Sequence, residues 1–344
     1  MSLLIALILL ATTLGPVAAL SSRHGPGNML ERASANNLTR LQKIQSMYAW
    51  EGFVYDTQMV GDFTRMKYMG ARNVITFEFC ELGADPTYYD TIIQAAGLAG
   101  ISIIPLVWTL PIHYAGQNYT AVDTFAIKSV PRIYALTEIW YDTHTDEQAV
   151  IRNPDPVLAV ALGDEPLYDD DAGSPEALAS YILGMKTSFQ AAGLDIPVSI
   201  SDMDIGWQQS GNITSVQNAV DFFMINNLVY YNNDSVWGGD QVTWSNFLDV
   251  MSYFDSLAEG RPILVTQTGW PSNENTWPSN STNVQANVPS EAAYWNLLDY
   301  HCEDYFKPNN IGWMWRSWND NIDGWGALYV NGTAKFPVQA RLSC

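Results

Sequence analysis

The feature that most constrains the fold is a repeated alternation of short apolar segments with longer amphipathic ones. Several of the short segments are continuous apolar runs, which is typical of parallel strands that are covered by helices on both faces. The eight expected strands are 45–50, 73–79, 102–108, 157–163, 197–201, 221–226, 263–266 and 312–315.

Helical patterns separate these strands. Ser174 and Pro175 form a capping residue followed by a proline at the first helical position, which indicates a helix start. The expected helices are 85–99, 174–192, 242–258 and 290–305, and 119–153 is expected to be a long loop with some helix. Strands that alternate with helices in one domain, residues 21–344, predict an α/β fold of the single (β/α)8 TIM barrel type. A doubly wound open sheet is the alternative, disfavoured because no glycine-rich turn follows the first strand.

The first twenty residues have the pattern of a signal peptide. An apolar run at 3–10 precedes the small residues Val17, Ala18 and Ala19, and the run is too short to span a bilayer. We therefore expect residues 1–20 to be removed and the protein to be secreted, extracellular or in a cell wall. Some of the Asn-X-Ser/Thr motifs would then carry glycans; they begin at Asn37, Asn118, Asn212, Asn233, Asn280 and Asn331.

The charge balance narrows the classes of ligand. The formal net charge is −20 and only 15% of the residues are charged, which argues against nucleic acid and anionic membranes as partners. The four histidines are scattered, and no His or Cys cluster has metal-ligand spacing. We expect no metal, no cofactor, no nucleic-acid or membrane partner, and a monomer.

Three cysteines allow one disulfide in an oxidising compartment. Cys302 and Cys344 are the expected pair, since both lie near the C-terminal end. Cys80 ends an apolar strand and is expected to be buried as a small hydrophobic residue.

Two strand ends carry the residues most typical of chemistry, because function in such barrels lies at the carboxyl ends of the strands. The fourth strand is followed by Asp164, Glu165 and Pro166, and residues 266–272 read T-Q-T-G-W-P-S. An acid after the fourth strand could also cap the next helix. The Gly-Trp-Pro turn could also be a rigid loop with a packed tryptophan. Two adjacent acids before a proline favour the functional interpretation.

These two segments resemble motifs of glycoside hydrolase family 17, which holds β-1,3-glucanases and glucan-modifying enzymes of plants and fungi. G-D-E-P is similar to the family's G-N-E motif, and T-Q-T-G-W-P-S is similar to its T-E-T-G-W-P-S motif. Residues 221–231 are similar to its sixth strand, with Asn226 and Tyr230 matching, and Ser201-Asp202 resembles the end of its fifth. The likeness is greatest to the fungal cell-wall branch and extends weakly along most of the chain.

The resemblance implies a retaining mechanism with two carboxylates about 5–5.5 Å apart. Glu165 matches the acid/base, whereas Gln267 stands at the position of the nucleophile. An amide oxygen is a very poor nucleophile and would not form the normal glycosyl ester. Without a carboxylate at 267, we expect that the pKa of Glu165 is no longer raised by a neighbouring charge.

The resemblance also implies residues that contact sugar, and it shows further departures. Asp164 replaces the family's asparagine before the acid/base, Leu228 replaces a strand-six tyrosine, and Arg316 and Asn319 replace acids after strand eight. The expected substrate contacts are Asp164, Asp202, Asn226, Tyr230, Trp270 and Trp315. Of the thirteen tryptophans, Trp270 is the expected sugar platform, since an indole face buries sugar C–H surface.

Another acid on the opposite side of the barrel mouth, about 6.5–9.5 Å from Glu165, would suit an inverting mechanism. The candidates are Glu78, Glu81, Asp202, Asp320 and Asp323. A hydrogen-bonding acid in a loop is the better interpretation of each.

Three hypotheses about function follow. The first is an enzyme that hydrolyses or transfers β-1,3-glucan with Glu165, and the retained acid favours it. The second is a catalytically inactive protein that binds the polysaccharide, which Gln267 favours. The third is a structural glycoprotein of the cell wall, which loss of the aromatic cleft would favour. We expect Gln267→Glu to raise activity if the rest of the site is intact.

Overall fold

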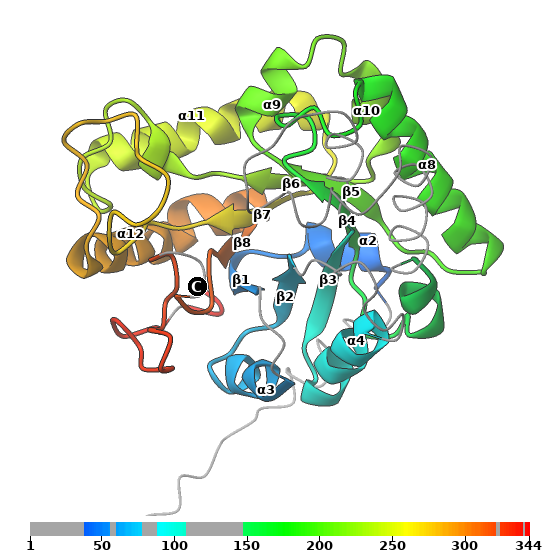
Figure 1. Cartoon of the computed structure of the whole chain (residues 1–344), viewed down its shortest axis with the longest axis horizontal. Coiled ribbons are helices and arrows are strands. Elements are labelled where there is room, and N and C mark those ends of the chain that lie inside the picture. The colour runs from blue at the N-terminus through cyan, green and yellow to red at the C-terminus, as the bar shows by residue number, and fades with distance from the viewer. Residues whose placement is uncertain (1–37, 56–59, 78–87, 108–146, 321–323, 340) are drawn as a thin grey trace, which may run out of the picture. The chain divides into compact units, whose positions relative to one another are not determined.

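The apolar segments form a closed parallel barrel (Figure 1). The computed structural model describes residues 38–55, 60–77, 88–107, 147–320, 324–339 and 341–344, and all but Leu38 belong to the unit Thr39–Cys344. Each strand pairs with its neighbours in the chain, and β1 also pairs with β8. The barrel confirms the (β/α)8 prediction and excludes the open sheet. The strands are β1 (Ala49–Tyr55), β2 (Asn73–Thr76), β3 (Ser102–Val107), β4 (Val160–Asp164), β5 (Val198–Asp202), β6 (Phe223–Asn226), β7 (Ile263–Thr268) and β8 (Gly312–Trp315).

Helices cover the outside of the barrel (Figure 1). The predicted cap is present, because Ser174 Oγ accepts a 3.1 Å hydrogen bond from Ala177 N at the start of α8. The last long helix ends earlier than expected, and a π-helical turn, η2, continues the chain. The helices are α2 (Arg40–Gln45), α3 (Val60–Tyr68), α4 (Tyr88–Ala99), α8 (Pro175–Ala191), α9 (Asp204–Gln209), α10 (Thr214–Ala219), α11 (Gln241–Ala258), α12 (Val288–Tyr300) and α13 (Lys307–Asn309), with the short turns η1 (Val229–Tyr231) and η2 (Cys302–Phe306).

Two hydrophobic clusters hold the layers together. The larger lies between strands and helices. The smaller fills the barrel interior with side chains such as Val54, Ile104, Met224 and Leu264, the packed interior that this fold requires. Ile44 of α2 joins the interior cluster, so this helix packs against the barrel core.

The first strand lies several residues later than the sequence pattern predicted. Residues 45–50 were expected, but β1 is Ala49–Tyr55. Glu51 and Gly52 interrupt its apolar pattern, although every residue of the strand is buried. Gly52 is required by packing, because a Cβ atom there would lie 1.7 Å from Asn73 O of β2.

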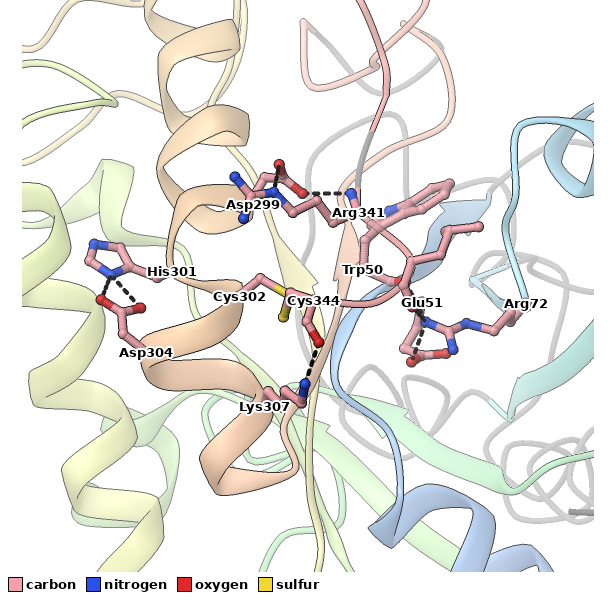
Figure 2. Close-up of a disulfide and its surroundings, with 11 residues drawn as sticks. Trp50, Glu51, Arg72, Asp299, His301, Cys302, Asp304, Lys307, Arg341 and Cys344 are labelled. Atoms are coloured by element: carbon pink, nitrogen blue, oxygen red, sulfur yellow. Dashed lines mark hydrogen bonds and ion pairs between the residues drawn. A yellow bond between two sulfur atoms is a disulfide. The ribbon is translucent and has the colours of Figure 1, made fainter. Parts of the chain in front are cut away.

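The C-terminal segment is tied to the barrel near its first two strands (Figure 2). Cys302 and Cys344 form the predicted disulfide, with Cα atoms 6.1 Å apart. Asp299 of α12 accepts a 2.6 Å hydrogen bond from Arg341 N, and Arg72 donates to Leu342 O at 2.9 Å. These bonds fix the last residues against α12 and the start of β2. Cys80 lies outside the described residues. Among the described helices, none is long and apolar enough to cross a membrane.

Candidate active site

Asp164 and Glu165 lie together at the mouth of the barrel, where β4 ends. Neighbouring residues of a regular strand point to opposite faces, but the β4–β5 register shifts between Ala161 and Asp164, and Glu165 adopts a left-handed φ of 57°. The backbone of Glu165 remains attached to β5, because its N–H donates to Ser201 O at 2.7 Å. This irregularity lets two consecutive carboxylates face the same partner.

That partner is the side-chain amide of Asn226, at the end of β6. Its Nδ2 donates to Asp164 Oδ1 and to Glu165 Oε1, both at 3.0 Å. The two oxygens are therefore at most 6.0 Å apart, twice that distance. Ser201 Oγ donates to Asn226 Oδ1 at 2.7 Å, which directs the amide nitrogen towards the acids. The predicted site residue Asn226 is thus a bridge between the two carboxylates.

Gln267 lies directly beside Asp164 and is fully buried near the end of β7. Its Nε2 donates to Asp164 Oδ1 at 2.6 Å, and its Oε1 accepts a hydrogen bond from Arg316. A guanidinium group only donates, so Arg316 fixes the orientation of the carboxamide. A Cβ atom at Gly269 would lie 2.3 Å from Arg316 O, so the glycine of the Gly-Trp-Pro turn is needed for this close approach.

The pKa values of both acids are raised. Burial, followed by the charge of Asp164, raises the pKa of Glu165 to about 7. Burial also raises the pKa of Asp164 to about 6, against the lowering effects of Arg316, Asn226 and Gln267. The expectation that no neighbouring charge acts on Glu165 is therefore wrong, because Asp164 supplies that charge. A carboxyl group with such a pKa is partly protonated at neutral pH.

Asp202, which the resemblance implies contacts sugar, hydrogen-bonds the backbone after β4 and after β5 in this structure. The residue is fully buried, and its two carboxylate oxygens accept backbone hydrogen bonds from Leu167 at 2.7 Å and Met203 at 2.8 Å. Burial raises its pKa well above the ordinary value. Asp202 therefore connects the end of β5 with the loop after β4 that contains Glu165.

Three aromatic residues that the resemblance implies contact sugar are buried in the structure. Trp270 and Trp315 are fully buried, and Tyr230 is 2% exposed. The rings of Tyr230 and Trp270 pack edge to face with centroids 5.4 Å apart, and Trp270 Nε1 donates to Gln285 O at 2.9 Å. These side chains belong to the hydrophobic cluster between strands and helices, where Trp270 and Trp315 both contact Tyr294 of α12.

Two aromatic residues that the sequence reasoning missed have exposed surface near the mouth. Tyr231 is partly exposed, and its hydroxyl group lies 3.4 Å from Thr276 Oγ1. Trp277, the next residue after Thr276, is 81% exposed. The signal was a tryptophan within a run of Asn, Ser, Thr and Pro, because such a loop offers little core in which to bury an indole ring.

A cavity of about 460 Å³ opens beside Asn226 between the loops that follow β5 and β6. Amide, carboxylate and phenol side chains supply much of its surface, together with Leu228 and Val250. Such groups match the hydroxyl groups and C–H faces of a sugar. The polar lining includes Asp204, Asn227, Tyr231, Asn232 and Asn280.

The remaining candidate acids form no second catalytic pair within the described chain. Asp320 is bound by the buried ammonium group of Lys335 at 2.6 Å. Glu78, Glu81 and Asp323 lie outside the described residues. Among the residues that are described, no group of three or more His, Cys, Asp or Glu side chains could hold a metal ion.

Comparison with known proteins identifies the type of domain. Among solved structures, an active-site mutant of a Rhizomucor miehei β-1,3-glucanosyltransferase in complex with laminaritriose is 19% identical, with a TM-score of 0.54 over 86% of this chain and 98% of that one. An endo-laminarinase from Formosa Hel1_33_131 is 14% identical, with a TM-score of 0.61 over 83% and 84%. GH5_18 from Streptomyces cattleya, in complex with GlcNAc, is 12% identical, with a TM-score of 0.60 over 83% and 78%.

At these identities the likeness shows the barrel fold alone. No curated protein sequence matches the chain. The model of the BtgE/BtgC glycoside hydrolase domain matches residues 83–322, which is more than half of the chain and includes β4 to β8 with the site described above. The chain therefore belongs to the BtgE/BtgC glycoside hydrolase domain family.

Proposed function

We propose that this is a secreted, cell-wall-directed protein that binds β-1,3-glucan at the barrel mouth and cleaves or transfers it, with Glu165 as the acid/base. The observation that carries the proposal is the pair of carboxylates on Asn226, since both acids are 3.0 Å from one amide nitrogen. A carbohydrate-active barrel and the strand motifs resembling glycoside hydrolase family 17 support it. Two of the similar solved structures are a β-1,3-glucanosyltransferase and a laminarinase.

Glu165 has the properties that the first step requires. Its pKa is raised to about 7, so a large fraction is protonated at mildly acidic to neutral pH and donates a proton to the leaving glycosidic oxygen. The resulting carboxylate then accepts a proton from water or from the hydroxyl group of an acceptor sugar. Asn226 hydrogen-bonds the charged form and steadies it after transfer.

A second candidate function is a protein that binds glucan without cleaving it. Gln267 favours this candidate, because its buried carboxamide is held at both ends by Asp164 and Arg316 and offers no carboxylate at that position. The cavity beside Asn226 and the exposed Trp277 would still bind polysaccharide.

The test combines binding and turnover on laminarin, a soluble β-1,3-glucan. Secreted protein is incubated with laminarin, and reducing ends are followed while affinity electrophoresis measures binding. Reducing-end release or chain-length redistribution that Glu165→Gln abolishes supports the enzyme. Binding without either change supports the second candidate. Absence of both binding and turnover contradicts the glucan assignment, and other β-glycans would then be screened.

A further inference from the structure

We propose that Asp164, and not residue 267, carries the second carboxylate of the reaction and acts as its nucleophile. This inference rests on the proposed glucan-cleaving function. It starts from the contact between Asp164 Oδ1 and Gln267 Nε2, which are 2.6 Å apart. Carboxylate and carboxamide groups have nearly the same shape, so a touching pair of them can hold the charge at either position. In this chain the carboxylate belongs to Asp164 and the neutral carboxamide belongs to Gln267.

Arg316 determines which end of the Gln267 carboxamide faces Asp164. It donates to Gln267 Oε1, so the amide nitrogen of Gln267 must face Asp164. Asn226 is fixed in the same sense, because Ser201 Oγ occupies its carbonyl oxygen at 2.7 Å. Two amide donors therefore converge on Asp164 Oδ1. Buried donors of fixed direction stabilise an anion, and a structure built to use Gln267 as the reacting group would leave its oxygen open.

The separation of the two hydrogen-bonded carboxylate oxygens is shorter than the range of inverting enzymes. Asp164 Oδ1 and Glu165 Oε1 are at most 6.0 Å apart, since each is 3.0 Å from Asn226 Nδ2. Retaining enzymes hold their carboxyl groups about 5–5.5 Å apart and inverting ones about 6.5–9.5 Å. The limit lies below the inverting range. Asp164 and Glu165 are each of intermediate exposure as residues, in contrast to the fully buried Gln267.

The chemical steps balance without a further reactant. A carboxylate oxygen of Asp164 forms a bond to the anomeric carbon while the glycosidic C–O bond breaks, and the leaving oxygen keeps that electron pair and takes the proton of Glu165. In the second step Glu165 takes a proton from water or from a sugar hydroxyl group. The oxygen so activated bonds to the anomeric carbon, and the ester bond to Asp164 breaks. Both acids return to their starting protonation states.

The experiment exchanges the two groups. Asp164→Asn, Gln267→Glu and the double variant Asp164→Asn/Gln267→Glu are compared with the wild type, and Asp195→Asn, an exposed acid in the loop before β5, is the matched control. Turnover of laminarin, its binding and thermal unfolding are measured for each variant. The wild type is also treated with 2-deoxy-2-fluoro-β-glucosyl fluoride, and the labelled peptide is identified by mass spectrometry. Proton NMR gives the anomeric form of the first product.

We expect the label on Asp164, retained β configuration, and a loss of about 10³-fold or more in turnover for Asp164→Asn with laminarin binding kept. The double variant, which again has one carboxylate in the pair, regains part of that loss. In contrast to the gain expected from the family resemblance, Gln267→Glu alone gains nothing, because Asp164 already supplies the second carboxylate. Asp195→Asn keeps the wild-type rate.

Label on another residue, an inverted product, or a folded Asp164→Asn variant with wild-type turnover would overturn the assignment of Asp164 and leave the glucan-cleaving function standing. Wild-type binding without turnover overturns the assignment and leaves the non-cleaving glucan-binding protein. A wild type that neither binds nor cleaves laminarin contradicts the proposed function itself.

Discussion

Replacing Asn226 with alanine should move the pH dependence of turnover to higher pH. The proposed mechanism requires Asp164 charged and Glu165 protonated, and burial raises their pKa values to about 6 and about 7. The wild-type profile should therefore be a narrow bell with its maximum between these values. The amide of Asn226 stabilises the charged form of both acids at 3.0 Å, so its removal must raise both pKa values.

The size of the shift follows from the two hydrogen bonds. A hydrogen bond to a charged group contributes about 1.5–3 kcal/mol, and one pKa unit corresponds to about 1.4 kcal/mol. Because water replaces part of each lost bond, we expect both limbs of the bell to move up by about one pH unit. The rate at the maximum should also fall by about tenfold or more, since the amide no longer fixes the geometry of the acids.

The assay is reducing-end release from laminarin between pH 4 and pH 9, on protein whose thermal unfolding shows that it is folded. Asn153→Ala is the matched control, because this asparagine also donates to a carboxylate, that of Asp90, but lies before β4 at the opposite end of the strand. Ser201→Ala is a milder variant, since it frees the orientation of the Asn226 amide. A folded Asn226→Ala variant whose limbs stay in place or move to lower pH refutes the reasoning.

Three further predictions concern binding and stability. Trp277→Ala should weaken laminarin binding by about tenfold in affinity electrophoresis, because losing the apolar contact costs about 1.4 kcal/mol of binding free energy. Trp270→Ala should instead lower the midpoint of thermal unfolding. Equal binding by wild type and Trp277→Ala contradicts the first expectation. Cys302→Ala opens a loop with a sequence separation of 42 and should cost about 4 kcal/mol of unfolding free energy in a urea titration, and no loss would mean that the bridge does not form. Lys335→Met should cost about 3–5 kcal/mol, because the buried ammonium group binds Asp320 at 2.6 Å, and a stability equal to wild type in the same titration would argue against that pair.

Local pattern was sufficient to predict the barrel and the strand ends that carry the site. Strands that are buried on both faces consist of continuous apolar runs, which are visible in the sequence. Seven of the eight strands were therefore predicted close to their observed positions. The first was displaced because Glu51 and Gly52 break the apolar pattern inside a fully buried strand. Glu165, Asn226 and Gln267 were expected at the mouth, and the structure brings them together around Asp164.

What the sequence could not decide is which strand-end side chains face the mouth and which pack beneath its loops. Trp270, Trp315 and Tyr230 lie at or near strand ends just as Asp164 and Asn226 do, yet they are buried in contacts with one another and with Tyr294 of α12. The partner of Asp164 is equally a long-range property, because Gln267 lies 103 residues away and is oriented by Arg316, the residue that follows β8. The sequence by itself determined the fold and the identity of the polar groups at the mouth, since both depend on residues near one another in the chain. Only the tertiary structure decided which polar groups surround Asp164 and Glu165, because these contacts join residues at the ends of β4, β5, β6, β7 and β8.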